Sequence, residues 1–196
     1  MKRTIQIALR TTIVTLVLTG LLYPLVVTGI AQVLFPWRAN GSLLTNDKGQ
    51  VVGSELIAQA FTNPAYFQPR PSAAGPQGYD AISSGGSNLG PTSRKLQDRL
   101  AKQLNEIKDK NPDMPGPVPV ELVTTSGSGL DPHISPQATL WQVPRIAHAR
   151  KIKPEDVRAI VQANIEGRQL GLFGEPRLNV LLLNLALDRA HGHPVP

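Results

Sequence analysis

The sequence predicts an α+β fold with one N-terminal transmembrane helix followed by a single loop-rich α+β domain, its helices concentrated in the C-terminal half. First, no charged residue lies between Arg10 and Arg38. Second, residues 39–196 are enough for one compact domain, and the whole chain carries 17 Gly and 18 Pro, which predicts many loops. Third, apolar residues at helical spacing recur from Leu96 onward, whereas strand-like patterns are short.

The uncharged window predicts a transmembrane helix over residues 11–37. Such a helix would be about 40 Å long, enough to cross a hydrocarbon core of about 30 Å with some tilt. Pro24, near its middle, predicts a kink or a neighbouring helix that absorbs the break. The alternatives are a cleaved signal peptide, whose apolar core is normally only about 7–15 residues, and a buried helix of a soluble protein. The length of the window favours the anchor.

Charge predicts the orientation of this helix. The chain has a formal net charge of +6, and its first 38 residues hold four basic residues (Lys2, Arg3, Arg10 and Arg38) and no acid. The remainder is nearly balanced, which argues against a nucleic-acid-binding surface. The positive-inside rule places residues 1–10 in the cytoplasm and residues 38–196 outside, which in a bacterium means a domain in the periplasm anchored to the inner membrane.

The first half of the outer domain is predicted to be mostly irregular. Residues 43–45 and 50–52 flank Asn-Asp-Lys-Gly, which predicts a hairpin. Residues 62–93 are dense in Pro, Gly, Ser and Asn and predict loops. A helix with its apolar stripe from Leu96 to Ile107 follows, with Ser93 as its N-cap and a stop at residues 111–112.

The second half is predicted to hold one strand and three further helices. The strand falls within residues 116–125, with Pro119 favouring an edge position. Ser135 caps a helix running to Arg150, which Pro144 must kink or divide. A helix opens at Pro154 and is ended by Gly167, and a last helix over residues 180–190 is capped by Asn179.

No catalytic residue or metal site is predicted. Cysteine is absent, and the four histidines (133, 148, 191 and 193) do not form a His-x-x-x-His or His-Glu-x-x-His pattern. Asp131 and His133 with Ser126 or Ser128 would be a triad by composition alone, but no Gly-x-Ser-x-Gly elbow accompanies them. We interpret Asp131-Pro132 as an Asx turn ahead of the Ser135 cap, and residues 191–196 as a frayed tail.

Residues 83–90, Ser-Ser-Gly-Gly-Ser-Asn-Leu-Gly, are the one stretch similar to a phosphate-binding loop. Successive glycines free backbone N–H groups to converge on an anion, and Ser84 and Ser87 would add hydroxyl donors. The Walker lysine is missing, however, and no Gly-x-Gly-x-x-Gly register is present. Spacing alone therefore favours a tight surface turn.

Several segments in a fixed order resemble the C subunit of the Kdp potassium-transporting ATPase, the KdpC family. These are YP at 23–24, FPWRANGSL at 35–43, RPSA at 70–73, SGGSNL at 84–89, PVELVT at 119–124, GLD at 129–131, ISPQA at 134–138, VPRIA at 143–147 and LNLALD at 183–188. The resemblance implies an inner-membrane subunit that joins a channel-like potassium-binding subunit, a P-type ATP-hydrolysing subunit and a small accessory peptide. It further implies a role in assembly and as a catalytic chaperone that raises the ATP affinity of the pump.

The resemblance also implies contact with ATP, although no cofactor is expected to be tightly bound. The implied nucleotide-binding residues are Ser84, Gly85, Gly86, Ser87, Asn88 and Leu89, a counterpart of the signature loop of ABC transporters. Ser87 stands where that signature has Gln. A domain outside the membrane meets essentially no ATP, so this implication conflicts with the predicted topology.

Two functions from different classes therefore remain. The first is a non-enzymatic pump subunit whose helix packs against a larger membrane partner and the lipid bilayer. Its predicted membrane or partner interface comprises Gly20, Tyr23, Pro24, Gly29, Trp37 and Arg38. The second is a membrane-anchored periplasmic hydrolase or stand-alone binding protein, which would show activity or ligand binding when the chain is expressed alone.

Overall fold

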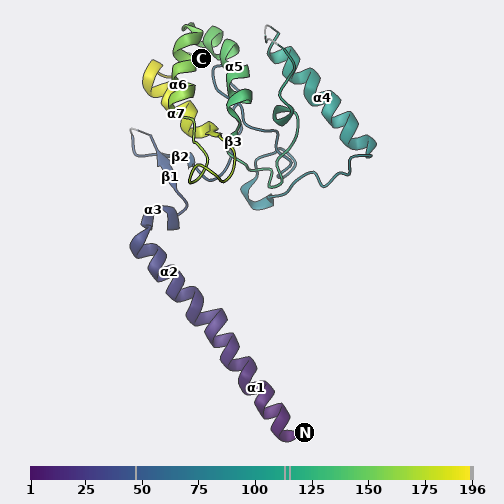
Figure 1. The fold of residues 1–196 in the computed structure, drawn as a ribbon, viewed down its shortest axis with the longest axis vertical. Coiled ribbons are helices and arrows are strands. Elements are labelled where there is room, and N and C mark those ends of the chain that lie inside the picture. The colour runs from purple at the N-terminus through teal and green to yellow at the C-terminus, as the bar shows by residue number, and fades with distance from the viewer. Residues whose placement is uncertain (47, 113, 115, 195–196) are drawn as a thin grey trace. The chain divides into compact units, whose positions relative to one another are not determined.

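The computed structural model describes residues 1–46, 48–112, 114 and 116–194, and the chain divides into two compact units, Met1–Ser54 and Glu55–Pro196 (Figure 1). The predicted mixture of helices and short strands is confirmed. We describe the two units separately.

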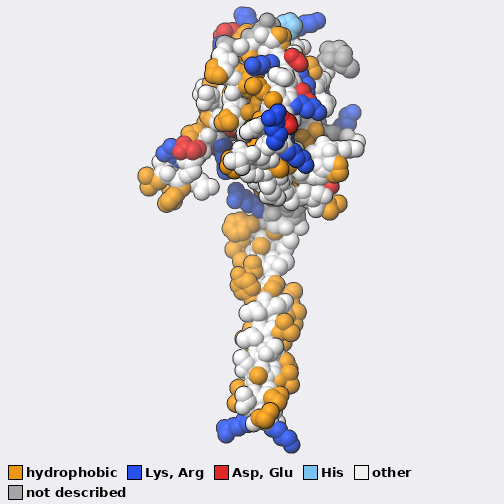
Figure 2. Space-filling model, turned by 90° about the vertical axis from the view of Figure 1, so that its right-hand side faces the viewer, with side chains coloured by type: hydrophobic (Ala, Val, Ile, Leu, Met, Phe, Trp, Pro, Cys, Tyr) orange, Lys and Arg blue, Asp and Glu red, His pale blue; other side chains and the backbone are white. Residues whose placement is uncertain are grey.

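The first unit is dominated by one long helical run, α1 (Lys2–Val17), the π-helical turn η1 (Leu18–Leu22) and α2 (Tyr23–Leu34). The run Lys2–Leu34 is long and apolar enough to cross a membrane, and none of its most apolar window is buried within the protein. Figure 2 shows Lys and Arg side chains gathered at its free end and largely apolar side chains along its length. The helix begins at Lys2, earlier than the expected Thr11, because the charged flank is helical as well.

Pro24 is accommodated by the π turn rather than by a break. Pro24 has no N–H and its ring would crowd the carbonyl of Gly20 in a regular α-helix. Instead, the Tyr23 N–H donates to the Leu18 carbonyl five residues earlier, which widens the turn directly before the proline. The helix thus continues through Pro24 into α2.

The helix ends just before the next proline, Pro36. Phe35 leaves helical geometry (φ −136°, ψ 52°), as the residue before a proline tends to, and α3 (Pro36–Ala39) follows as a separate turn. A single helix through residue 37 is therefore not formed. The expected hairpin is confirmed: β1 (Leu43–Thr45) pairs antiparallel with β2 (Val51–Ser54), with an irregularity in register between Leu44 and Thr45.

The second unit is built around three C-terminal helices. These are α5 (Pro136–Arg150), α6 (Pro154–Ala163) and α7 (Val180–His191), joined by a two-stranded antiparallel ribbon of β3 (His133–Ile134) and β4 (Leu178–Asn179). Their apolar faces form the core, which includes Phe67, Ile134, Val143, Ile146, Val157, Val161, Leu178, Leu183 and Leu187. Capping places the helices as expected: Ser135 Oγ accepts the Ala138 N–H, and Asn179 Oδ1 accepts the N–H groups of Leu181 and Leu182.

Residues 55–93 wrap around this core almost without regular structure, with one 3₁₀ turn, η2 (Ala81–Ser83). The amphipathic helix α4 (Arg94–Lys110) then follows as expected, ending at Asn111. Ser93 occupies its N-cap position without a side-chain capping hydrogen bond, and none of the helix's residues is fully buried. Ile107 is the residue of the stripe that packs against the core.

Two expectations in this unit were wrong. No strand forms in the described part of 116–125; a 3₁₀ turn, η3 (Val120–Leu122), takes its place, with the Leu122 N–H donating to the Pro119 carbonyl. Helix α5 is not divided at Pro144, which leaves a kink as the expected alternative. Helix α6 ends at Ala163 instead of Gly167, because the Asn164 side-chain amide donates to the Ile160 carbonyl and satisfies the helix end.

Candidate functional site

Two buried amide side chains hold an irregular segment onto the helices. Asn184 of α7 accepts the Phe67 N–H (2.9 Å) and donates to the Phe67 carbonyl (3.0 Å). Gln142 of α5 does the same with Gln68, at 2.9 and 3.1 Å. Each side chain therefore replaces a strand neighbour for the backbone of residues 67–68, whose polar groups would otherwise be buried without partners.

Two arginines of α5 hold the same segment through further hydrogen bonds. Arg145 donates to the carbonyls of Pro64 and Tyr66 and to Asn111 Oδ1, the last at 2.8 Å. Burial lowers the pKa of Arg145 to about 10. Arg150 donates to the Ala65 carbonyl and forms a 2.7 Å ion pair with Asp188, whose other oxygen accepts the Tyr66 hydroxyl. Residues 63–68 are thus clamped between α5 and α7.

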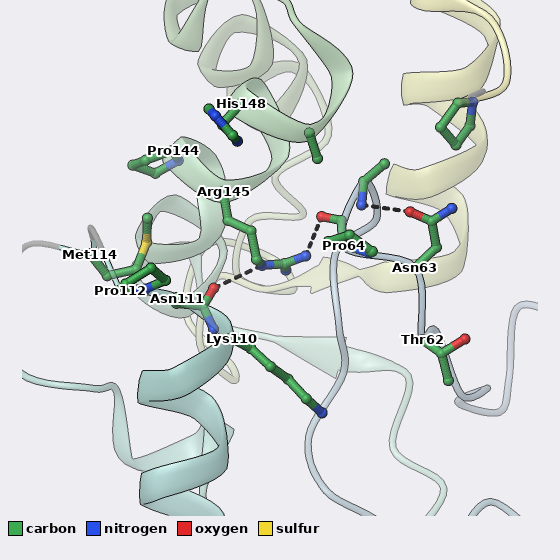
Figure 3. Close-up of a pocket in the computed structure, with 13 residues that line it drawn as sticks. Thr62, Asn63, Pro64, Lys110, Asn111, Pro112, Met114, Pro144, Arg145 and His148 are labelled. Carbon is green, nitrogen blue, oxygen red and sulfur yellow. Dashed lines mark hydrogen bonds between the residues drawn. The ribbon is translucent and has the colours of Figure 1, made fainter. Parts of the chain in front are cut away.

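Arg145 also lines a cavity of about 860 Å³ between the end of α4 and the C-terminal half of α5 (Figure 3). Its lining includes two further basic side chains, Lys110 and His148, and apolar walls from prolines and Met114. The guanidinium group lies between Asn111 and the Pro64 carbonyl, so most of its donors serve the clamp. We assign this cavity no chemistry.

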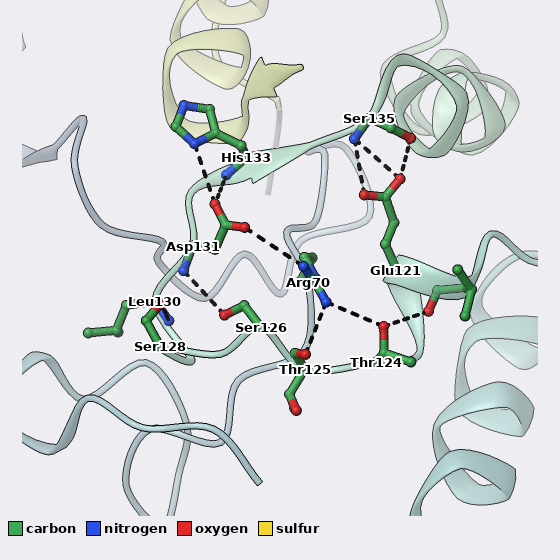
Figure 4. A network of polar contacts seen from close by, with 11 residues as sticks. Arg70, Glu121, Thr124, Thr125, Ser126, Ser128, Leu130, Asp131, His133 and Ser135 are labelled. Carbon is green, nitrogen blue, oxygen red and sulfur yellow. Dashed lines mark hydrogen bonds and ion pairs between the residues drawn. The ribbon is translucent and has the colours of Figure 1, made fainter. Parts of the chain in front are cut away.

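A polar network joins Arg70 to residues 124–133 (Figure 4). Arg70 donates to the Thr125 carbonyl (3.0 Å) and lies 3.8 Å from Asp131, whose other oxygen is 3.4 Å from His133 Nδ1. Hydrogen bonding to His133, with a smaller contribution from the Arg70 charge, lowers the pKa of Asp131 although partial burial opposes the shift. The Asp131 side chain also accepts the His133 N–H, so the expected Asx turn is confirmed.

The network does not assemble a hydrolase triad. Ser126 Oγ accepts the Asp131 N–H and Ser128 Oγ accepts the Leu130 N–H, so both hydroxyls serve the local turn. No hydrogen bond joins either hydroxyl to His133 among the described residues. Glu121 accepts both the N–H and the hydroxyl of Ser135 at the start of α5, which is a helix-capping arrangement.

Three of the segments on which the resemblance depends meet in space: residues 70–73, 84–89 and 129–131. Ser72 Oγ donates to the Gly129 carbonyl (2.6 Å) and accepts the N–H groups of Ala74 and Tyr79. The Gly85 N–H (2.7 Å) and the Ser84 hydroxyl (3.1 Å) both donate to the Ser128 carbonyl. The glycine-rich loop therefore lies against residues 126–129, backbone to backbone.

This packing explains two of the glycines without a bound anion. A Cβ at Gly86 would lie 2.9 Å from the Gly127 carbonyl oxygen, and a Cβ at Gly129 would lie 2.7 Å from the Gly85 carbonyl oxygen. Gly129 also has a φ of +68°, a conformation that L side chains rarely adopt. Only glycine allows the backbones to approach this closely.

The residues of the loop do not fit a nucleotide triphosphate. The Gly85 amide and the Ser84 hydroxyl, two donors that a phosphate would need, are directed to the Ser128 carbonyl. Ser84 is the one member of 84–89 in the lining of the adjacent cavity of about 490 Å³. That lining pairs Arg70 and His133 with the Asp131 carboxylate, which would repel phosphate. The geometry of this loop therefore does not support an ATP-binding site.

Three of the predicted interface residues in the apolar helix, Gly20, Tyr23 and Gly29, are not packed against any other described part of the chain. Tyr23 is 66% exposed. A Cβ at Gly29 would meet nothing within 4 Å, and one at Gly20 would make only an ordinary contact with Leu16. A regular α-helix turns about 100° per residue, so positions 20 and 29 would lie on nearly opposite sides of such a helix. The π turn reduces the angle between these two positions around the helix axis.

The residues after the helix differ, because Trp37 has an internal contact. Its indole N–H donates to the Leu43 carbonyl (2.9 Å), which ties the turn α3 to the first strand of the hairpin. Arg38 has no side-chain partner among the described residues and is exposed. Trp37 thus orders the connection at the end of the apolar helix, while Arg38 is exposed beside it.

The polar side chains that hold residues 64–68 onto α5 and α7, which we call the clamp residues, were not predicted from the sequence. Gln142, Asn184 and Arg145 are polar side chains on otherwise apolar helix faces, and Asn184 stands between Leu183 and Leu185. A polar residue at a predicted core position was the available signal, because it must find a hydrogen-bond partner when buried.

Comparison with known proteins assigns the chain to a family. The model of the KdpC family, described as K+-transporting ATPase, c chain, matches residues 5–189. A protein of Myxococcus xanthus is 61% identical over 189 residues, covering 96% of this chain and 89% of the relative. One of Rhodospirillum rubrum is 55% identical, covering 96% of each chain, and one of Koribacter versatilis is 48% identical over both full lengths. Each of these relatives is named a potassium-transporting ATPase KdpC subunit. The chain therefore belongs to the KdpC family, the c chains of K+-transporting ATPases.

Proposed function

We propose that this chain is the membrane-anchored, non-catalytic accessory subunit of an ATP-driven potassium uptake pump. Its membership of the KdpC family, with identity that extends over nearly the whole chain, is the observation that carries the proposal. The proposed partners are a channel-like potassium-binding subunit, a P-type ATP-hydrolysing subunit and a small accessory peptide. The proposed contribution is assembly and stability of the complex, together with an increase in the ATP affinity of the hydrolysing subunit.

The helix Lys2–Leu34 supports the anchoring role. Its exposed apolar side chains find no cover within the protein, so a bilayer or other membrane helices would satisfy them. Gly20, with space around it and Pro24 one turn away, would permit close approach of a partner helix, since small residues favour such packing in membranes.

We propose an N-terminus in the cytoplasm and an outer domain in the periplasm. The support is the positive charge of Lys2, Arg3 and Arg10 on one side of the apolar stretch. Because the chain lacks cysteine, Thr4→Cys and Lys48→Cys each introduce a single thiol, and the first leaves all three flanking charges in place. A membrane-impermeant maleimide should label the second in intact spheroplasts and the first only after permeabilisation; the opposite pattern would reverse the topology.

The non-catalytic role is supported by what the polar side chains already do. Arg70, Asp131 and His133 engage one another and the turn around residue 125, and Glu121 and Ser135 engage each other at a helix start. A membrane-anchored hydrolase, the alternative, would predict ester or amide hydrolysis by the purified chain alone.

For ATP, the packing of the glycine-rich loop supports a structural role, with no tightly bound cofactor. Direct contact between Ser84–Leu89 and ATP remains what the family resemblance implies. Under our proposal, any effect of the chain on ATP affinity passes through the hydrolysing subunit rather than through this loop.

The proposal is tested by affinity purification of the tagged full chain from gently solubilised membranes of its own host. We expect the other ATPase subunits to be recovered with it in fixed stoichiometry. Recovery of the chain alone, from cells in which those subunits are expressed, would contradict the proposal.

A further inference from the structure

Residues 166–177, between α6 and β4, form a short two-armed projection. The N–H and carbonyl groups of Glu166 and Arg177 are paired at 2.9 and 3.0 Å, and those of Gln169 and Phe173 at 2.9 Å each. Ion pairs also join the arms: Arg177 to Glu166 at 3.0 Å and Arg168 to Glu175 at 2.7 Å. The projection leads directly into Leu178, which is fully buried in the core. It is therefore braced along its length and fixed at its base.

The end of this projection is apolar and exposed. Leu170, Leu172 and Phe173, which we call the apolar tip, are 89%, 76% and 64% exposed. Leu170 adopts a φ of +52°, a conformation that a bulky side chain rarely takes. Three large apolar side chains within four residues, held out on a braced support, are not needed for the core of this protein. Such a cluster marks an interaction surface.

We infer that the apolar tip docks into an apolar recess on another protein subunit of the ATPase complex, an inference that rests on the proposed function. The charges of the projection argue for a protein rather than a lipid surface. Its two acidic and two basic side chains pair with one another, so it presents no net positive charge to anionic headgroups. A neutral support with an apolar end fits an uncharged recess.

The test places the photo-crosslinking residue p-benzoylphenylalanine at Phe173 of the full chain, an exchange of one aromatic ring for another. The matched control places it at Ile82, which is 97% exposed in a different part of the same unit. Membranes from cells that express the whole complex are irradiated, and adducts are identified by mass. We expect an adduct with another ATPase subunit from position 173 and none from position 82.

The outcomes separate this inference from the proposed function. If the other subunits co-purify with the chain but position 173 gives no subunit adduct, or only lipid adducts or adducts within the chain, the docking of the tip is contradicted while the proposed function stands. If both positions give the same adducts, the tip has no special contact and the inference fails. If the other subunits do not co-purify, both fail together.

A second variant provides an independent measurement. Leu170→Ser combined with Leu172→Ser removes apolar surface that is already in water, so it leaves the fold intact. We expect it to reduce the adduct from position 173 to the level of the Ile82 control. An undiminished adduct would mean that the apolar character of the tip does not drive the contact.

Discussion

Asn184 shows how one polar side chain can determine the path of a long irregular segment. It lies in the core, between leucines of α7, and makes two hydrogen bonds to the backbone of Phe67, 117 residues earlier in the chain. Phe67 itself is fully buried. The segment therefore follows α7 because only there are its buried N–H and carbonyl satisfied.

Asn184→Ala should lower the free energy of unfolding by about 2–4 kcal/mol, because it leaves a buried donor and a buried acceptor of Phe67 without partners. Denaturant unfolding of the full chain in mild detergent measures the change. Asn105→Ala, at an exposed position of α4, is the matched control and should change stability by no more than about 0.5 kcal/mol. Equal effects of the two variants would mean that the clamp contributes little.

The lowered pKa of Asp131 predicts that the stability of the fold depends on pH. Its pKa is lowered below the usual value of about 3.9, chiefly by hydrogen bonding to His133. A carboxyl group with a lowered pKa contributes stability while it is ionised, above its unfolded pKa, and loses that contribution as the pH falls through its folded pKa.

The difference in stability between wild type and Asp131→Asn should therefore be largest near neutral pH and should shrink as the pH falls below about 4, toward the lowered pKa of folded Asp131. Thermal unfolding of both proteins between pH 3 and pH 7 measures it, and Asp98→Asn, at an exposed position of α4, is the control. A difference that stays constant across this range would show that the charge of Asp131 is not what stabilises the turn.

At the scale of elements, the glycine-rich loop and the turn at residues 126–129 act as one packed unit. Gly86 has no room for a side chain, whereas a Cβ at Gly90 would meet nothing within 4 Å. Gly86→Ala should therefore destabilise the chain by about 1–3 kcal/mol through overpacking, while Gly90→Ala should be neutral or slightly stabilising. Denaturant unfolding distinguishes the two.

The same pair tests the implied nucleotide site. Calorimetric titration of the wild-type chain with millimolar ATP should show no saturable binding, because the Gly85 N–H and the Ser84 hydroxyl are directed to the Ser128 carbonyl. Saturable binding that Gly86→Ala abolishes and Gly90→Ala preserves would restore the loop as a nucleotide site.

Substitutions at Gly20 and Gly29 in the apolar helix can test contacts with partner subunits without disturbing packing inside the chain. Leucine at Gly20 or at Gly29 has no backbone to collide with inside the chain, so reduced recovery of the other subunits in affinity purification would reflect an intermolecular contact. Because the two positions lie on different sides of the helix, we expect one substitution, Gly20→Leu, to reduce recovery more than the other. Equal recovery from both variants and wild type would exclude a close glycine contact.

The elements that local signals specify could be predicted from the sequence. The uncharged stretch predicted a long apolar helix, and the caps Ser135 and Asn179 predicted two helix starts to the residue. The strand expected near Val120 failed because successive prolines remove N–H groups that a ladder needs, and a 3₁₀ turn satisfies the remaining ones. The meeting of residues 70–73, 84–89 and 126–131 could not be predicted, because it depends on contacts between segments far apart in the chain.

At the scale of the whole molecule, the net charge of +6 divides into two parts with different meanings. Four basic residues lie before and after the apolar stretch, whereas residues 39–196 are nearly balanced, and many of their charges pair internally. A chain with a helix apolar enough to cross a membrane, its own folded core and no assembled catalytic triad among the described residues suits the proposed subunit that acts through its partners.

The most direct test of this account is potassium-stimulated ATP hydrolysis by the purified complex, prepared with and without this chain. The account predicts that hydrolysis is lost without the chain, returns when the full chain is restored, and then requires less ATP for half-maximal rate than any residual activity without it. It also predicts that the chain alone hydrolyses no ATP. An unchanged potassium-stimulated rate and ATP dependence in a complex that lacks the chain would contradict it.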